Sequence, residues 1–264
     1  ADMGRATSGA AKALLGKVYL TFHKWEEARD ILSQLIGKYQ LVSPIAQVFN
    51  VDNKNNKEII FAVHFNKEIE GEGHSYWYNL TNSTDDTNQT SSLLNTYPTD
   101  DARKDLITYV QAAKNVYLMR KFYDTKSTTF NTVGNDQILL RYADVLLMYA
   151  EALNEIEYDA SEGSLALKCL NAVRERAGIS NLTARQLPSK EKFRKGILVE
   201  RQSEFPYEGQ RWFDLVRMGF AKSAMAENGI EISDYQLLFP IPQQEIEKVG
   251  DETILWQNPG YDNK

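Results

Sequence analysis

Apolar residues recur at helical spacing near the start of the chain. Over residues 7–22 they advance in steps of four, as Ala10, Leu14, Val18 and Phe22. A second run over residues 25–36 repeats this spacing. Because an α-helix brings residues four apart onto one face, both runs are predicted to be amphipathic helices that pack through these rows. His23 and Lys24 would join them as an antiparallel pair.

The same two segments have the residue offsets of a tetratricopeptide hairpin. Gly16 and Tyr19 follow Leu15 in the first helix, and Ala28 and Leu32 occupy the corresponding positions of the second. Glycine has no side chain, so Gly16 is predicted to let the two helices approach closely.

A second helical hairpin is predicted over residues 138–156 and 164–177, with Gly178 as the C-terminal cap. Its first helix is apolar on nearly all sides and should therefore lie at the centre of the fold. Arg141 and Asp144 are expected to pair with each other on its surface, since they are three residues apart.

A segment of different chemistry, residues 40–137, separates the two hairpins. Residues 58–65 read as a buried strand, and residues 106–110 and 116–122 as short strands. Residues 79–92 form a polar stretch typical of a recognition loop. The sequence therefore predicts a mainly α-helical fold of tetratricopeptide-like hairpins, with a loop-rich insertion that contains a few short strands.

Three consecutive aromatic residues in the insertion are the strongest candidates for ligand binding. Tyr76, Trp77 and Tyr78 precede Asn79 and Asn82 of the polar stretch. Aromatic faces can stack on sugar rings while neighbouring amides bond to hydroxyl groups, so these five residues form a candidate glycan site. At least one ring is expected to pack inward, because three in a row cannot all face one way on a strand. Packing is also the ordinary role of a large aromatic residue.

Composition excludes several other classes of protein. The net charge is −6 and charges of both signs are interspersed, which argues against nucleic acid as a partner. No apolar run approaches the roughly 20 residues of a membrane-spanning helix. The single cysteine, Cys169, has no partner for a disulfide and is interpreted as a free buried thiol. No cofactor motif or metal-ligand spacing is found, so neither a cofactor nor a metal is expected.

Acidic pairs raise the question of catalysis. Glu204 and Glu208, and Asp100 and Asp101, could in principle form the two carboxylates of a glycoside hydrolase. Basic residues surround the first pair over residues 200–217, so a buried or half-buried ion network is the favoured interpretation. Pro206 and Gly209 predict a break between two helices here. No catalytic residue is proposed.

The segment 200–217 also resembles the C-terminal motif of the SusD/RagB family of bacterial outer-membrane lipoproteins. The matching positions are Glu200, Arg201, Glu204, Glu208, Gly209, Arg211, Trp212, Asp214, Leu215 and Arg217. Residues 140–156, 170–178 and 238–261 resemble the same family in the same order. Pro206 departs from the motif, where a helix-compatible small residue is more usual.

The resemblance implies a single SusD/RagB-like domain over residues 1–264, as the C-terminal part of the family fold. It implies binding of an oligosaccharide or polysaccharide at the bacterial cell surface, and delivery to a SusC-like TonB-dependent outer-membrane transporter, without cleavage. A secretion signal, a lipid-bearing cysteine and an N-terminal part of the fold are expected upstream. Attachment to the membrane would occur only through that lipid.

A different function class stays open. Tetratricopeptide-like hairpins could form a scaffold of the uptake complex that binds a protein or peptide and has no sugar site of its own. Exposed aromatic residues in the insertion would favour glycan binding, whereas an open apolar groove between helices would favour a protein ligand.

Overall fold

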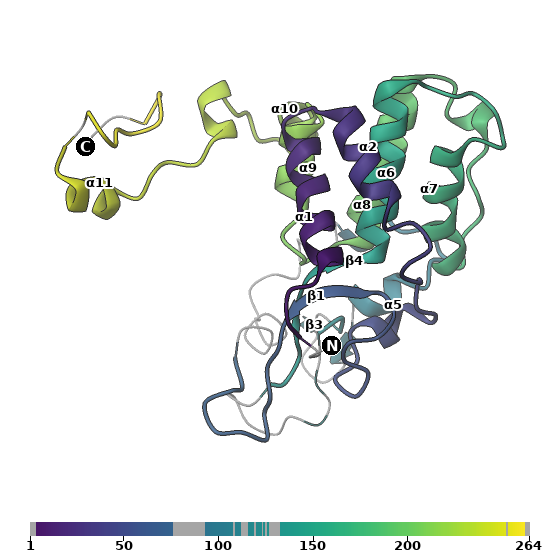
Figure 1. Ribbon diagram of the computed structural model, residues 1–264, viewed down its shortest axis with the longest axis horizontal. Coiled ribbons are helices and arrows are strands. Elements are labelled where there is room, and N and C mark those ends of the chain that lie inside the picture. The colour runs from purple at the N-terminus through teal and green to yellow at the C-terminus, as the bar shows by residue number, and fades with distance from the viewer. Residues whose placement is uncertain are drawn as a thin grey trace. The chain divides into compact units, whose positions relative to one another are not determined.

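Figure 1 shows a computed structural model of the protein, which is mainly helical. The structure describes residues 4–75, 93–107, 109–111, 116–118, 120–122, 124, 126, 133–251 and 253–261. The chain divides into two compact units, Ala1–Gly209 (unit 1) and Gln210–Lys264 (unit 2). Among the described residues, no helix is long and apolar enough to cross a membrane.

Five helices form the framework of unit 1: α1 (Ser8–Thr21), α2 (Trp25–Ser33), α6 (Tyr142–Ile156), α7 (Leu165–Arg176) and α8 (Lys190–Glu204). A short 3-10 helix, η2 (Ala184–Gln186), precedes α8. Helix α1 packs against α2, α2 against α6, and α6 against both α7 and α8 (Figure 1). Nearly every side chain of α6 is buried, so the prediction that this helix is central is confirmed.

The first hairpin lies where it is predicted, although α2 ends at Ser33 and not at residue 36. Thr7 caps α1 by accepting a hydrogen bond from the amide of Ala10, at 3.1 Å. The turn occurs at His23, whose φ of 55° is left-handed. A Cβ atom on Gly16 would lie only 2.5 Å from Cδ2 of Leu32. The close approach of α1 and α2 therefore depends on glycine at position 16.

The predicted packing face of α1 is wrong. Leu14, Val18 and Phe22 are 53%, 41% and 70% exposed, whereas Ala13 and Leu20 are fully buried. Helix α1 carries apolar residues on more than one side, so spacing alone does not show which side packs. The small side, with Ala13 and Gly16, lies inward because it allows the shortest distance to the neighbouring helices.

The insertion contributes two small antiparallel sheets. Strand β1 (Ile59–Val63) pairs with β4 (Gln137–Arg141), and β2 (Tyr109–Gln111) pairs with β3 (Val116–Leu118). A 3-10 turn, η1 (Ile45–Val48), and a short helix, α5 (Lys104–Ile107), complete the segment.

Two predictions for this region need correction. Residues 138–141 are not the start of a helix, because β1 supplies a hydrogen-bonding partner that the local sequence does not reveal. Leu106 and Ile107 belong to α5, and a strand begins only at Tyr109.

The second hairpin ends as predicted. Ser164 caps α7 by accepting from the amide of Leu167, and Gly178 follows the helix with a φ of 80°. Cys169 is buried, which confirms the expectation, and burial raises the pKa of its thiol to about 11.

Unit 2 contains α9 (Arg211–Arg217), α10 (Ala221–Ala226), η3 (Asp234–Leu237) and α11 (Gln243–Val249). The predicted break before α9 is confirmed, since α8 ends at Glu204 and Gly209 has a φ of 71°. Within the unit, the Tyr261 hydroxyl donates to the carbonyl oxygen of Leu238, and the Gln257 side chain forms two bonds with the backbone of Ile241. The tail is thus fastened to residues 238–241.

Candidate functional site

The five predicted glycan-binding residues, Tyr76, Trp77, Tyr78, Asn79 and Asn82, lie outside the described residues. Their role therefore stays a prediction. The described residues on both sides of this segment show how the chain is held before and after it.

His74 fixes the chain just before the aromatic triplet. Its backbone exchanges two hydrogen bonds with Val133, at 3.1 and 3.2 Å. Its Nε2 donates to the carbonyl oxygen of Asn135 at 2.8 Å, and its ring centroid lies 4.3 Å from that of Phe65. Two backbone bonds, a side-chain bond and a ring contact thus secure the residue two positions before Tyr76.

A second anchor lies at the end of β1. The Asp136 carboxylate accepts hydrogen bonds from Lys54 Nζ at 2.6 Å, from His64 Nδ1 at 2.7 Å and from the Phe65 amide at 3.1 Å. This one carboxylate joins the segment before β4 to Lys54, which precedes β1, and to the two residues that follow β1. Asp136 therefore holds the chain in place directly before β4, the strand that leads from the insertion to α6.

Tyr97 holds the chain on the other side of residues 76–92. Its hydroxyl donates to the carbonyl oxygen of Ser203 in α8, at 2.8 Å, and the contact is buried. Burial raises the pKa of this phenol far above its ordinary value, so the hydroxyl stays protonated. The insertion is thus attached to the helical framework here as well.

Arg103 extends this attachment into a buried ion cluster. Its guanidinium forms a bidentate pair with Asp101, and it reaches Glu200 at 2.5 Å and Glu204 at 3.1 Å. All four side chains are nearly inaccessible to solvent. Charge-assisted bonds of this type are among the stronger ones in proteins when every group is satisfied.

Arg141 occupies the centre of the cluster. It contacts Glu58 at 2.9 Å, Glu204 at 2.6 Å and Glu208 at 2.8 Å. Arg176 binds Glu58 and Glu204 from α7. The cluster therefore connects the start of β1, the junction of β4 with α6, α7 and α8.

The expected pair of Arg141 with Asp144 is wrong. Arg141 has extended backbone and precedes α6, so the helical spacing that suggested the pair does not apply. Asp144 instead binds Lys17 and Arg201, each at 2.7 Å. Burial alone would raise the pKa of Asp144, but these two cations outweigh it and hold that pKa well below its usual range.

Lys121 brings the later part of the insertion into the same cluster. Its Nζ lies 2.5 Å from Glu208 Oε1 and 4.6 Å from the ring centroid of Phe49. It also donates to the carbonyl oxygens of Glu204 and Pro206, both at 3.2 Å. Burial lowers the pKa of Lys121 to about 8, although the Glu208 carboxylate opposes this shift.

The electrostatics confirm an ion network at Glu204 and Glu208. Burial alone would raise the pKa of each carboxyl. The guanidiniums of Arg176 and Arg141 outweigh this for Glu204, and Arg141 with Lys121 for Glu208, so both pKa values are lowered. Carboxylates held ionised in this way do not donate a proton near neutral pH, as a general acid must. In the other candidate pair, Asp101 is paired with Arg103 while Asp100 is exposed.

Arg103 and Lys121 are structurally central residues that sequence reasoning missed. A signal exists for Lys121, because a lone lysine beside Phe122 in a predicted strand has to find a partner or reach solvent. No comparable signal in the sequence distinguishes Arg103 from the arginines that lie at the surface. Within the described part of the chain, no group of three or more His, Cys, Asp or Glu residues could hold a metal ion.

Comparison with known proteins assigns the fold to a family. Residues 75–231 match the SusD family, and the chain belongs to this family. It is 31% identical to SusD-like protein P2 of Formosa agariphila over 189 residues, which is 67% of this chain and 36% of that protein.

Solved structures agree with this assignment. Surface glycan-binding protein A from Bacteroides fluxus superposes with a TM-score of 0.79 at 27% identity, covering 98% of this chain and 63% of the other. A laminarin-binding SusD-like protein superposes with a TM-score of 0.72 at 25% identity, covering 98% of this chain and 64% of the other. The chain thus spans less than two thirds of each of these proteins.

Proposed function

We propose that this chain binds a glycan at the bacterial cell surface, through Tyr76, Trp77, Tyr78, Asn79 and Asn82. The rings would stack on sugar faces, and the two amides would bond to hydroxyl groups. Shallow sites of this kind gain affinity when several sugar rings engage together.

Membership of the SusD family is the observation that carries this proposal. Two proteins of similar structure are named for glycan or laminarin binding. A further one, surface glycan-binding protein A from Bacteroides thetaiotaomicron, was solved in complex with laminarihexaose. These names support the ligand class and leave the particular saccharide open.

The anchors around the insertion are consistent with a binding platform. His74 and Tyr97 fix the chain on either side of residues 76–92, and the buried ion cluster joins that region to α6, α7 and α8. A rigid base lowers the conformational entropy lost on binding, so it favours affinity at a small site. Catalysis is not proposed, because Glu204 and Glu208 are held by arginine and lysine side chains.

Delivery of the glycan completes the proposal. By analogy with its family, the protein would hand the bound glycan to a SusC-like TonB-dependent transporter in the outer membrane. A lipid carried by a preceding part of the longer protein would hold it at the extracellular face. The bound saccharide would leave chemically unchanged.

Affinity electrophoresis in gels that contain single polysaccharides tests the ligand class. We expect retarded migration with at least one member of a panel that includes laminarin, and no release of reducing ends from that polysaccharide. Unretarded migration with the whole panel would contradict glycan binding. Release of reducing ends would indicate a hydrolase instead.

A further inference from the structure

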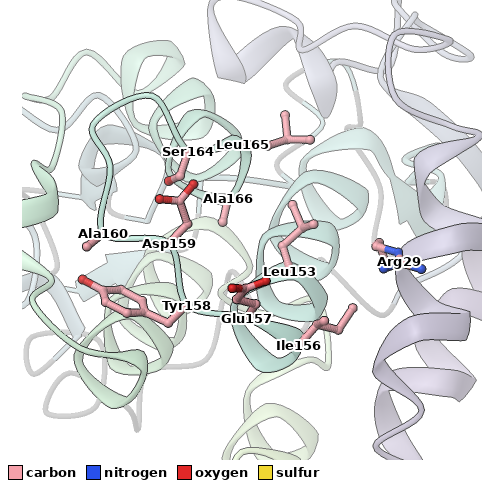
Figure 2. A pocket seen from close by; sticks show the side chains of 10 residues that line it. All are labelled: Arg29, Leu153, Ile156, Glu157, Tyr158, Asp159, Ala160, Ser164, Leu165 and Ala166. Carbon is pink, nitrogen blue, oxygen red and sulfur yellow. The ribbon is translucent and has the colours of Figure 1, made fainter.

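A cleft of about 480 Å³ opens at the C-terminal end of α6, whose other end follows β4, and Figure 2 shows the side chains that line it. Its walls come from α2, the last turn of α6, the loop after α6 and the first turn of α7. Helix α6 has 15 residues, so it is roughly 22 Å long, and it separates the cleft from β4, the strand that follows the insertion. None of the residues that line the cleft belongs to the proposed glycan site.

Aliphatic side chains form the base of the cleft. Leu153 and Ile156 come from α6, and Leu165 and Ala166 from the first turn of α7. Leu165 is 47% exposed although it is a large apolar residue. Burying such a surface beneath a ligand would release ordered water and favour binding.

Two carboxylates lie beside this apolar base. Glu157 and Asp159 follow α6 and line the cleft. The last turn of α6 contains no basic residue to balance the partial negative charge at the C-terminal end of its dipole. Among the contacts of the described residues, the Glu157 carboxylate has no hydrogen bond or ion pair.

Arg29, the basic residue that lines the cleft, forms an exposed ion pair with the adjacent Asp30, so Glu157 and Asp159 leave the lining with a net negative charge. Its Nε and NH2 groups lie 2.8 and 2.7 Å from Oδ1 of Asp30. The cleft therefore favours a cation, and its aliphatic base favours a cation carried on an apolar stem. Lysine and arginine side chains combine these two properties.

The same chemistry disfavours a second sugar site. Tyr158 is the aromatic residue that lines the cleft, and its hydroxyl donates to the carbonyl oxygen of Leu187 at 2.6 Å. Sugar binding needs an accessible ring face and free polar groups that match hydroxyls, whereas aliphatic residues with carboxylates at the edge match a basic peptide better.

We propose that this cleft binds a segment of a protein partner in which a lysine or arginine lies between apolar residues. The basic side chain lies along Leu153 and Ile156 and places its charged end near Glu157. The neighbouring apolar residues of the partner cover Leu165. This docking site does not depend on glycan binding by the insertion.

Fluorescence polarisation with three labelled pentapeptides tests the proposal on the full chain. The probes are Leu-Lys-Leu-Arg-Leu, its acidic counterpart Leu-Glu-Leu-Asp-Leu and its polar counterpart Ser-Lys-Ser-Arg-Ser, all with blocked ends. We expect saturable binding of the first peptide alone, weakened by added salt because the attraction is partly electrostatic. Equal binding of the first two peptides, or no binding of the first, would overturn the proposal.

Two substitutions locate the binding. Glu157→Lys reverses the charge and Leu165→Gln removes the exposed apolar group, and each should weaken binding of the basic peptide by about tenfold or more. Glu70→Lys makes the same change in net charge on the exposed insertion and should leave binding unchanged. If Glu157→Lys and Leu165→Gln fold as judged by circular dichroism and bind like the wild type, the peptide does not occupy this cleft.

Discussion

Arg141 and Glu204 form a buried ion pair of 2.6 Å, and each residue is only 1% exposed. The pair connects the residue before α6 to the last residue of α8, two elements that are far apart in the sequence. Glu204 also binds Arg103 and Arg176, so one carboxylate is shared by three guanidiniums. Loss of its charge would remove one anionic partner from each of three buried arginines.

Glu204→Gln should therefore destabilise the protein strongly. The substitution preserves the shape of the side chain but removes the negative charge, and breaking a buried pair in this way costs about 3–5 kcal/mol. Urea unfolding followed by circular dichroism measures the loss. Lys248→Gln, which removes an exposed ion pair with Glu245, is the matched control and should change stability by less than about 1 kcal/mol. Equal effects of the two substitutions would contradict the central role of Glu204.

Acid should weaken the fold through the same carboxyls. The pKa values of Glu204, Glu208 and Asp144 are lowered in the folded state, so the unfolded chain binds more protons at acid pH. Their stabilisation is present above the ordinary carboxyl pKa values, near 4, and is lost as the pH falls toward the lower folded values. The free energy of unfolding should fall steeply below about pH 4.5, and less steeply for Glu204→Gln. Parallel profiles for the two proteins would show that Glu204 is not involved.

Lys121 predicts a second window, on the alkaline side, in which stability rises with pH. Its pKa of about 8 in the folded state lies below the ordinary 10.5, so between these values the unfolded chain holds a proton that the folded chain has released. The free energy of unfolding should accordingly rise with pH in this window, by a few kcal/mol relative to Lys121→Met. Cys169 shifts stability the other way above about pH 9, but it does so in both proteins and cancels in the difference. A difference that does not change with pH would contradict the assignment.

Gly16→Ala should destabilise unit 1 although alanine is the better helix former. The new Cβ would come within 2.5 Å of the Leu32 side chain, and overpacking of this kind costs about 1–3 kcal/mol. Thermal or urea unfolding measures the effect. Gly16→Ala should cost less stability when it is added to a Leu32→Ala variant than when it is added to the wild type, because the clashing side chain is then absent. Gly163→Ala is the control, since a Cβ at position 163 meets nothing within 4 Å. A neutral Gly16→Ala would mean that α1 and α2 lie further apart.

The sequence predicted the helical hairpins well because their signals are local. Gly16 allows the close approach of its helix pair and Gly178 follows the end of α7, and both residues act as expected. The break around Gly209 likewise depends on residues next to each other in the chain.

The errors concern contacts between distant segments. Residues 138–141 form a strand because β1 lies beside them, and Arg141 leaves Asp144 for Glu58, Glu204 and Glu208. The outward face of α1 was misjudged because Leu14, Val18 and Phe22 are as apolar as the side that packs. The two sides of α1 differ in the size of their side chains, and the smaller side, with Ala13 and Gly16, is the one that packs against the neighbouring helices.

Trp77 provides the most direct test of glycan binding. Isothermal titration calorimetry would compare the wild type, Trp77→Ala and Phe22→Ala with the saccharide that retards the protein most in affinity gels. Phe22 is the control, because it is an exposed aromatic residue at the C-terminal cap of α1, outside the insertion. We predict that Trp77→Ala weakens binding by about tenfold or more while Phe22→Ala binds like the wild type. Unchanged affinity in the folded Trp77→Ala variant would contradict the proposed role of the aromatic triplet.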